Sequence, residues 1–288
     1  MLWNQAVEVD FFNTALENFA SPQQLFYQIN NEYYAYIPRN NRIHGQTLQS
    51  RNALIGDYTE RWCQKLFSPI AEKFGLFAIT KVRCDDFNLT SRSPADLAFC
   101  RKNSSIQTAN DIVVVFEVKM SIVSNYRYSE REGIQLVGDY NSHTGQPSLL
   151  RSDSMLKAIG KSLIIRVADW RASNIPIVIL GNTPISNSYL HKVDLLKKTG
   201  AIQGIWSLYP NPITGHHNYH STENGFLTIQ NEDDLVGKMS DIISNPLQYF
   251  SAMLPKPTIG EYIRIANQKT TDVEKAEKFL ELLRGTYE

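Results

Sequence analysis

The sequence predicts an α/β protein in which a mixed central β-sheet is flanked by helices. Three observations support this class. Apolar residues recur at helical spacing in several segments, runs rich in β-forming residues alternate with these segments, and one run is apolar at five successive positions. Strands that alternate with helices are typical of a sheet covered by helices. The predicted core elements, in chain order, are a helix at 52–74, strands at 76–83, 96–101 and 111–122, a helix at 152–167, a strand at 175–180, a helix at 186–198 and a strand at 202–209.

The first half of this core is predicted from apolar spacing and from turn residues. In the first helix, apolar side chains return every three or four positions, and Gly75 stands where a helix stop is expected. Pro94 and polar residues separate the first two strands, and residues 103–110 indicate a turn. The successive apolar residues at 112–116 indicate a strand that is covered on both faces.

Glycine and proline set the boundaries in the second half. Residues 124–151 carry three glycines and Pro147, which predicts a loop. Ser152 or Asp153 is a suitable N-cap for the helix that follows, and Gly181 closes a buried strand. Beyond the core, the sequence predicts a short strand after Gly225, a helix at 232–243 and an amphipathic helix at 272–283.

The length of 288 residues fits one domain, residues 1–288, with the core at 52–209. The additions at 1–51 and 210–288 either form a recognition or dimerisation module or thicken the core. No apolar run approaches the roughly 18 residues that span a bilayer, and the first residues show no secretory signal. We therefore expect a cytoplasmic protein with no membrane partner. The three cysteines are interpreted as small buried hydrophobic residues: Cys63, Cys84 and Cys100.

Charge is balanced in total, with 29 basic and 29 acidic residues, but it is distributed unevenly. Residues 151–204 hold eight Lys or Arg against three acids, whereas residues 223–288 hold seven against eleven. A protein that binds nucleic acid non-specifically usually carries a basic excess. The distribution is compatible with a nucleic acid held on one face, but charge alone does not indicate a function.

Two charged residues end the otherwise apolar strand at 111–122. Because strand side chains alternate between faces, Glu117 and Lys119 are predicted to lie on the same face. Burying them requires partners. Asp96 opens the preceding strand, 21 residues before Glu117, and a hairpin between the two strands would bring the three side chains together. The sequence therefore predicts two carboxylates and an ammonium at one end of the sheet.

These side chains suit the hydrolysis of a phosphodiester. Mg²⁺ prefers oxygen ligands, often one or two carboxylates, and Asp96 and Glu117 would supply them. A bound Mg²⁺ lowers the pKa of a water ligand and stabilises negative charge on the phosphoryl group. Lys119 would position or deprotonate that water. The alternative is a structural ion-pair cluster at a strand end, with Asp96 capping a helix or turn.

The tripeptides Pro-Ala-Asp at 94–96 and Glu-Val-Lys at 117–119 resemble the motif of the PD-(D/E)xK nuclease superfamily. The predicted order of helix, three strands, helix and strand also resembles the core of that superfamily, over about residues 52–209. The resemblance implies that Asp96, Glu117 and Lys119 are catalytic and that Glu60 is a further carboxylate on the preceding helix. The chain size and the sequence outside the core make the chain most similar to type II restriction endonucleases.

The resemblance implies a sequence-specific endonuclease that cleaves double-stranded DNA with Mg²⁺ and leaves 5′-phosphates. Balanced charge favours specificity, because base contacts then carry more of the affinity. A homodimer is expected, since a two-fold protein matches a palindromic site and cuts both strands. One alternative is a repair or recombination nuclease on the same core, which would lack one fixed cleavage sequence. The other is a non-catalytic DNA-binding α/β protein, which would show no metal-dependent cleavage.

Several basic and aromatic side chains are candidate DNA contacts. Lys157 and Lys161 lie one turn apart on the helix after the motif, where they would contact phosphate or support the active site, unless they form a solvated face. The segment 23–42, which includes Arg39 and Arg42, either contacts base edges or forms a helix packed on the core. Further candidates lie in the predicted loop after Lys119: Tyr126, Arg127, Tyr128, His143 and Arg151.

Two other patterns are not interpreted as ligand sites. Residues 158–162 resemble the end of a P-loop but lack its leading glycine and a preceding strand, so no nucleotide cofactor is expected. His216, His217 and His220 have no cysteine or second cluster nearby. A loop is therefore favoured there over a zinc site.

Overall fold

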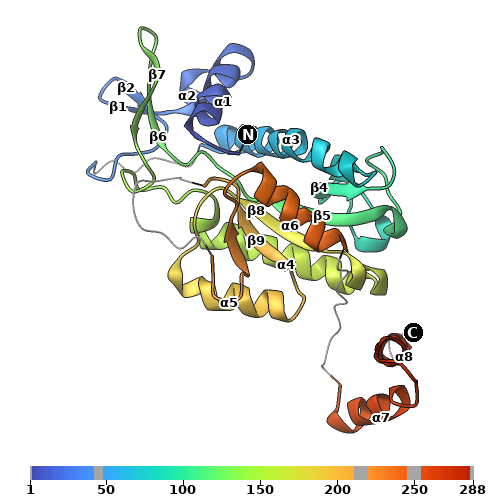
Figure 1. Cartoon of the computed structure of the whole chain (residues 1–288). Helices are drawn as coiled ribbons and strands as arrows, with labels where there is room; N and C mark the ends of the chain where they lie inside the picture. Colours follow the sequence, from blue (N-terminus) through green and yellow to red (C-terminus); the bar gives the residue numbers. More distant parts are fainter. Residues whose placement is uncertain (1, 42–47, 211–219, 245–253, 286–288) are drawn as a thin grey trace.

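The computed structural model describes residues 2–41, 48–210, 220–244 and 254–285. Its central feature is a six-stranded mixed sheet with helices on both faces, which confirms the predicted α/β class (Figure 1). A second sheet of four strands lies at the end of the molecule where the first helices of the chain are found (Figure 1).

The six-stranded sheet has the order β10-β9-β8-β5-β4-β3. Strands β3, β4 and β5 pair antiparallel, whereas β5, β8, β9 and β10 pair parallel. The central strands β5 and β8 are buried along almost their whole length, as the apolar run at 112–116 predicts. The strands are β3 (Phe77–Val82), β4 (Ala95–Cys100), β5 (Ile112–Val118), β8 (Ile177–Gly181), β9 (Gly204–Ser207) and β10 (Phe226–Thr228).

Helices cover the two faces of this sheet. Over one face lie α3 (Gln49–Lys73) and α6 (Glu232–Ser244), whose apolar side chains share a core with Val114 and Phe116 of β5. Over the other lie α4 (Ser152–Ala168) and α5 (Asn187–Lys198), and there Val115 of β5 joins the core. Alternate residues of β5 thus point to opposite faces. The predicted helices and strands of this core are confirmed, with ends that differ by a few residues.

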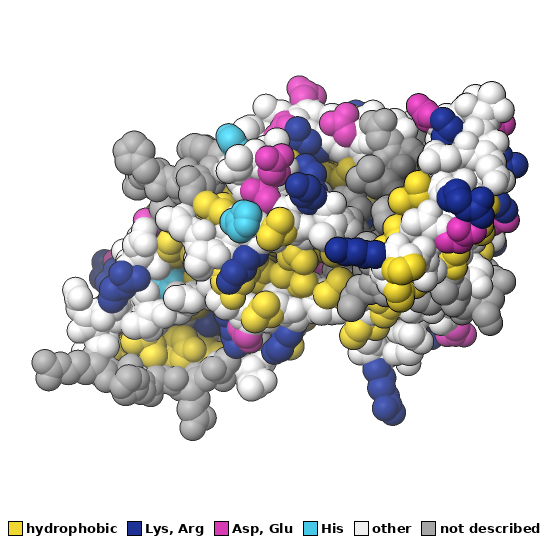
Figure 2. Space-filling model, turned by 90° about the horizontal axis from the view of Figure 1, so that it is seen from below, with side chains coloured by type: hydrophobic (Ala, Val, Ile, Leu, Met, Phe, Trp, Pro, Cys, Tyr) yellow, Lys and Arg dark blue, Asp and Glu magenta, His cyan; other side chains and the backbone are white. Residues whose placement is uncertain are grey.

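Helix α4 is apolar on part of its outer side as well. It exposes Leu156, Ile164 and Val167, and the exposed Trp170 follows in the short 3-10 helix η4 (Trp170–Asn174). Figure 2 shows the face on which α4 and α5 lie, with hydrophobic side chains near its middle and charges of both signs around them. Positive charge is therefore not concentrated on this face.

The loop predicted at 124–151 is wrong. The segment contains β6 (Asn125–Ser129) and β7 (Gly133–Gly138), which join β1 (Tyr27–Ile29) and β2 (Glu32–Tyr34) in the antiparallel order β1-β2-β6-β7. Gly133, with a φ of +69°, ends the turn between β6 and β7, so the glycines bound strands instead of marking a continuous loop. The remaining 3-10 helices are η1 (Asp85–Phe87), η2 (Ala109–Asp111) and η3 (Ser148–Leu150).

The N-terminal addition packs into the main core. It forms α1 (Gln5–Asn18), the short α2 (Pro22–Leu25) and the β1–β2 hairpin, so the alternative of a helix over 23–42 is wrong. Trp3 and Phe12 are fully buried, and the Trp3 amide donates to the carbonyl of Leu208, beyond the end of β9. Residues 2–41 therefore thicken the core and also build half of the second sheet.

The predicted short strand and helix of the C-terminal addition are confirmed as β10, which continues the sheet, and α6, which covers it. The amphipathic helix predicted at 272–283 is α8 (Asp272–Arg284), and it packs against a helix that the sequence analysis missed, α7 (Lys256–Ala266). The Arg284 guanidinium lies 4.8 Å from the ring centroid of Trp170, so α8 contacts η4. All three cysteines are buried, which confirms their interpretation. Within the described ranges, no helix is both long and apolar enough to cross a membrane.

Candidate active site

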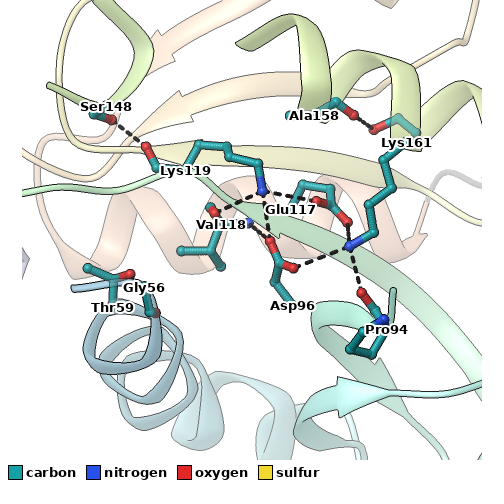
Figure 3. Close-up of polar contacts among 11 residues, drawn as sticks. Gly56, Thr59, Pro94, Asp96, Glu117, Val118, Lys119, Ser148, Ala158 and Lys161 are labelled. Carbon is teal, nitrogen blue, oxygen red and sulfur yellow. Dashed lines mark hydrogen bonds and ion pairs between the residues drawn. The ribbon is translucent and has the colours of Figure 1, made fainter. Parts of the chain in front are cut away.

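Asp96, Glu117 and Lys119 come together at one end of β4 and β5, as the sequence predicts (Figure 3). Leu97 pairs with Phe116 in the antiparallel register, so the next positions outward are Asp96 and Glu117. The Lys119 amide donates to the Leu180 carbonyl at 2.7 Å, which extends the contact with β8 one residue beyond β5. Main-chain pairing on both sides of β5 therefore fixes all three positions.

The Lys119 ammonium binds both carboxylates. Its Nζ lies 3.1 Å from Asp96 Oδ2 and 3.2 Å from Glu117 Oε2, and it also donates to the Val118 carbonyl at 3.2 Å. Asp96 Oδ2 accepts a second hydrogen bond, of 2.8 Å, from the Val118 amide. One oxygen of each carboxylate is thus held by Lys119, and the geometry of the motif agrees with side chains that share one face of β5.

Lys161 of α4 reaches the same carboxylates from the other side (Figure 3). Its Nζ lies 3.2 Å from Asp96 Oδ1, 2.6 Å from Glu117 Oε1 and 2.6 Å from the Pro94 carbonyl. Lys161 thus contacts both carboxylates of the candidate site, which agrees with the predicted role of supporting that site. The pair of carboxylates therefore already holds a cation between Oδ1 and Oε1.

Burial and charge push the two acidic pKa values apart. Burial, followed by the charge of Asp96, raises the pKa of the fully buried Glu117 to about 7. Burial also opposes ionisation of Asp96, but the charges of Lys119 and Lys161 outweigh it and lower the pKa of Asp96. Burial disfavours the charged form of Lys119, yet Asp96 and Glu117 raise its pKa. Asp96 and Lys119 are therefore charged at neutral pH, while Glu117 exchanges its proton there.

Glu60 lies on α3, and the charges of the site act on the pKa of its half-buried side chain. Burial and then the charge of Asp96 raise the pKa of Glu60 to about 7, and the charge of Lys119 acts in the opposite direction. Within the described part of the chain, no three His, Cys, Asp or Glu side chains form a group that could hold a metal ion. The structure thus brings Asp96 and Glu117 together and leaves Glu60 outside that pair.

Ser148 positions Lys119 and was missed by the sequence analysis. Its hydroxyl donates to the Lys119 carbonyl at 2.6 Å and accepts a hydrogen bond from the backbone amide of Asn182 at 3.1 Å. Ser148 has a φ of +49°, an unusual conformation for a residue with a side chain, and such outliers occur often at functional sites. No local sequence signal distinguishes this serine, because it lies in the segment predicted as a loop.

A cleft of about 540 Å³ opens beside Lys119. Its walls come from the start of α3, the residues after β5, the segment before α4 and the first turn of α4. Of the predicted DNA contacts, Arg151 lines this cleft, whereas Lys157 is 76% exposed outside it and pairs with Asp153 at 3.5 Å. The exposed face of α4 thus includes Lys157 and not Lys161.

Two predicted DNA contacts are wrong. Tyr126 is fully buried and donates to Glu8 Oε2 at 2.8 Å, because strand alternation turns it toward the core. His143 is 1% exposed, since its ring stacks on Tyr36 at 4.0 Å between centroids and its Nε2 contacts the Val123 carbonyl at 3.1 Å. Neither side chain is available at the surface.

The other candidate residues lie on the second sheet, on exposed segments, or outside the residues that the structure describes. Arg127 pairs with Glu32 and Glu132, and Tyr128 stacks on Phe26. Arg39 is exposed, and Arg42 lies outside the described residues. So do His216 and His217, whereas the exposed His220 contacts the Ser221 carbonyl through Nδ1 at 3.1 Å.

Comparison of the chain with protein-family models, with curated proteins and with solved structures gives no match. The function is therefore argued from the site itself.

Proposed function

We propose that this protein is a Mg²⁺-dependent endonuclease that hydrolyses phosphodiester bonds of double-stranded DNA. The observation that carries the proposal is the convergence of Asp96, Glu117 and Lys119 at the end of β5, beside a cleft. Two carboxylates with an ammonium next to them can bind a hard cation and stabilise charge on a phosphoryl group. The resemblance of the motif to PD-(D/E)xK nucleases supports the same activity.

The donor set fits Mg²⁺. Asp96 and Glu117 offer oxygen ligands, and the cation that they attract here is the Lys161 ammonium, which contacts an oxygen of each. When bound by these carboxylates, Mg²⁺ would supply an activated water and neutralise charge on the phosphoryl oxygens. Lys161 would then hold the carboxylates together before the metal binds and would compete with it for them.

Lys119 acts on the reacting groups. Its side chain is 24% exposed and lines the cleft, and its ammonium is close enough to both carboxylates to remain charged. It therefore orients the attacking water and stabilises the phosphoryl oxygens. The water oxygen bonds to phosphorus while the bond from phosphorus to the 3′ oxygen breaks. The water proton is lost to solvent, and the 3′ oxygen takes up a proton. The products are a 5′-phosphate and a 3′-hydroxyl.

The proposal includes sequence-specific cleavage by a homodimer, as in type II restriction endonucleases. The balanced count of 29 basic and 29 acidic residues supports specific over indiscriminate binding, because phosphate contacts alone would then supply less of the affinity. A two-fold dimer would place two copies of the site on a palindrome and cut both strands.

The test is cleavage of plasmid and phage DNA with Mg²⁺ or with EDTA, by the wild type and by Lys119→Ala. We expect discrete fragments that require Mg²⁺ and a loss of at least about 1,000-fold in rate for Lys119→Ala. Lys102→Ala is the matched control, since Lys102 also pairs with an acid, Asp111 at 2.9 Å, but near the opposite end of β4 and β5. Its rate should equal that of the wild type.

Cleavage by Lys119→Ala at the wild-type rate would contradict the proposal, as would intact DNA under all conditions. Sequencing the fragment ends extends the test. One fixed sequence at the ends supports a restriction-type enzyme, and ends without a common sequence assign the activity to repair or recombination.

A further inference from the structure

The cleft beside Lys119 is positively charged. Arg51, Lys119 and Arg151 line it, and none of the described residues that line it is Asp or Glu. Arg151 pairs through Nε with Asp153 at 2.6 Å, but Asp153 lies outside the lining. Lys119 likewise pairs with Asp96 and Glu117, which lie outside the lining. A concave surface whose described lining carries cations and no acid attracts an anionic group.

Arg51 is the buried member of this set. It is 4% exposed, and its guanidinium lies 5.3 Å from the ring centroid of Tyr27 and 4.9 Å from that of Tyr36. Its Nη1 donates to the carbonyls of Ala35 and Leu25, whereas its Nε has no hydrogen-bond partner among the residues that the structure describes. A buried cation with an unpaired donor is costly, and an anion in the cleft would offset the charge of Arg51 even without a contact to Nε, which is itself buried.

The first turn of α4 adds a second source of positive potential. Arg151 is the N-cap residue and Ser154 lies in the first turn, and both line the cleft. The Arg151 side chain does not cap this end of the 17-residue helix. The Ser154 amide donates to the Arg151 carbonyl, so this end of α4 adds the positive end of the helix dipole beside the cleft.

We infer that this cleft receives one unstacked nucleotide of the DNA strand, next to the phosphodiester that is cleaved. The inference rests on the proposed function and names what its site recognises. A volume of about 540 Å³ is the size of a small-ligand pocket, and the cleft shares Lys119 with the catalytic group. A base inside a duplex is covered on both faces, so it can enter such a recess only out of the stack.

Neutral polar groups in the cleft are suited to a base. Asn52 and Gln146 line it and carry amides, which form paired hydrogen bonds with base edges. Tyr36 does not offer a free ring face, because His143 stacks on one side and Arg51 lies over it as well. Arg51 lies over the rings of both Tyr27 and Tyr36, so the amides of Asn52 and Gln146, and not a stacking surface, are left to contact the base.

The experiment uses the full-length protein in EDTA and a duplex that carries 2-aminopurine, whose fluorescence rises when the base leaves the stack. One duplex places the 2-aminopurine in a single-nucleotide bulge, and the other pairs it fully. We expect binding of the wild type to brighten the bulged probe. Brightening of the paired probe as well would show that the protein extracts the base, and brightening of the bulged probe alone that it accepts one already unpaired.

Arg151→Ala and Lys157→Ala form a matched pair of variants. Both side chains are exposed, both pair with Asp153 and both lie at the start of α4, but only Arg151 lines the cleft. We expect Arg151→Ala to weaken binding of the bulged probe by about fivefold to tenfold and to suppress the brightening. Lys157→Ala should behave as the wild type.

The inference is overturned if the wild type binds without brightening either probe, or if the two variants weaken binding equally. The cleavage assay of the proposed function separates the two failures. If DNA is cut with Mg²⁺ but is bound without brightening, the proposed nuclease activity stands and the inference about the cleft is wrong. If brightening depends on Arg151 but no DNA is cleaved, the inference about the cleft stands and the proposed nuclease activity is wrong.

Discussion

Glu8 and Glu117 are both fully buried, and burial raises the pKa of each to about 7. Their surroundings differ completely. Glu8 of α1 accepts hydrogen bonds from four neutral donors: Trp3 Nε1 at 2.9 Å, the Val123 amide at 2.7 Å, the Ser124 amide at 3.1 Å and the Tyr126 hydroxyl at 2.8 Å. Glu117 is held by two ammonium groups, at 3.2 Å from Lys119 and 2.6 Å from Lys161.

Burial and a raised pKa therefore do not by themselves mark a functional acid. The donors around Glu8 belong to backbone or to packed aromatic rings, so they join α1 to the segment between β5 and β6 and cannot exchange for a ligand. The ammonium groups around Glu117 are the ends of flexible side chains that are 22% and 24% exposed. A metal ion can displace such partners, whereas it cannot displace a backbone amide.

The largest expected effect is on catalysis. Glu117→Gln keeps the shape of the side chain but removes its charge, so we expect the Mg²⁺-dependent cleavage rate to fall by at least about 1,000-fold. The free energy of unfolding at pH 8 should stay equal or rise by about 1–2 kcal/mol, because a buried carboxylate with a raised pKa opposes folding when ionised. Urea unfolding beside the cleavage assay measures both quantities. A large loss of stability would place Glu117 in the same structural role as Glu8.

The opposite pattern is expected at Glu8. Glu8→Ala leaves four buried donors without an acceptor, two of them backbone amides, so the free energy of unfolding should fall by about 3–4 kcal/mol. The rate per folded molecule should be unchanged. Glu32→Ala, which removes a surface partner of Arg127, is the control and should cost less than about 1 kcal/mol. Equal losses in the two variants would refute the distinction drawn for Glu8.

The smallest expected effect is on the pH dependence of stability in EDTA. The pKa of Glu8 rises from 4.5 to about 7 on folding, and the groups that face it, Tyr126 and Tyr209, stay neutral in this range because their own pKa values are raised. Its proton therefore favours folding fully below about pH 4.5, and this contribution is lost as the pH rises through about 7. Between pH 5 and 8 the free energy of unfolding should therefore decrease by about 2–3 kcal/mol less in Glu8→Gln than in the wild type.

Urea titrations at successive pH values measure this dependence. Glu117→Gln should remove a similar part of it, and the double variant should remove both, because the two acids share no partner. A wild-type pH dependence in Glu8→Gln would contradict the assigned protonation of Glu8.

The sequence-based predictions succeeded where the residues of a single segment are enough to determine its structure. The five apolar residues of β5 need cover on both faces whatever lies beside them, and strand alternation alone puts Glu117 and Lys119 on one face. The same reasoning failed at 124–151, where glycines at the ends of strands resemble glycines of a loop. There the pairing of β6 with β2, from a distant segment, decides the structure.

The sequence by itself therefore determined the α/β core, the place of Asp96, Glu117 and Lys119 and the chemistry that they suit. Only the tertiary structure decided which side chains surround them. Lys161 contacts Asp96 across 65 residues of chain, and Glu8 meets Val123 across 115. Arg51 of α3 and Arg151, the residue before α4, likewise line one cleft although they lie 100 positions apart in the chain. Such contacts depend on how whole elements pack, which no short stretch of sequence encodes.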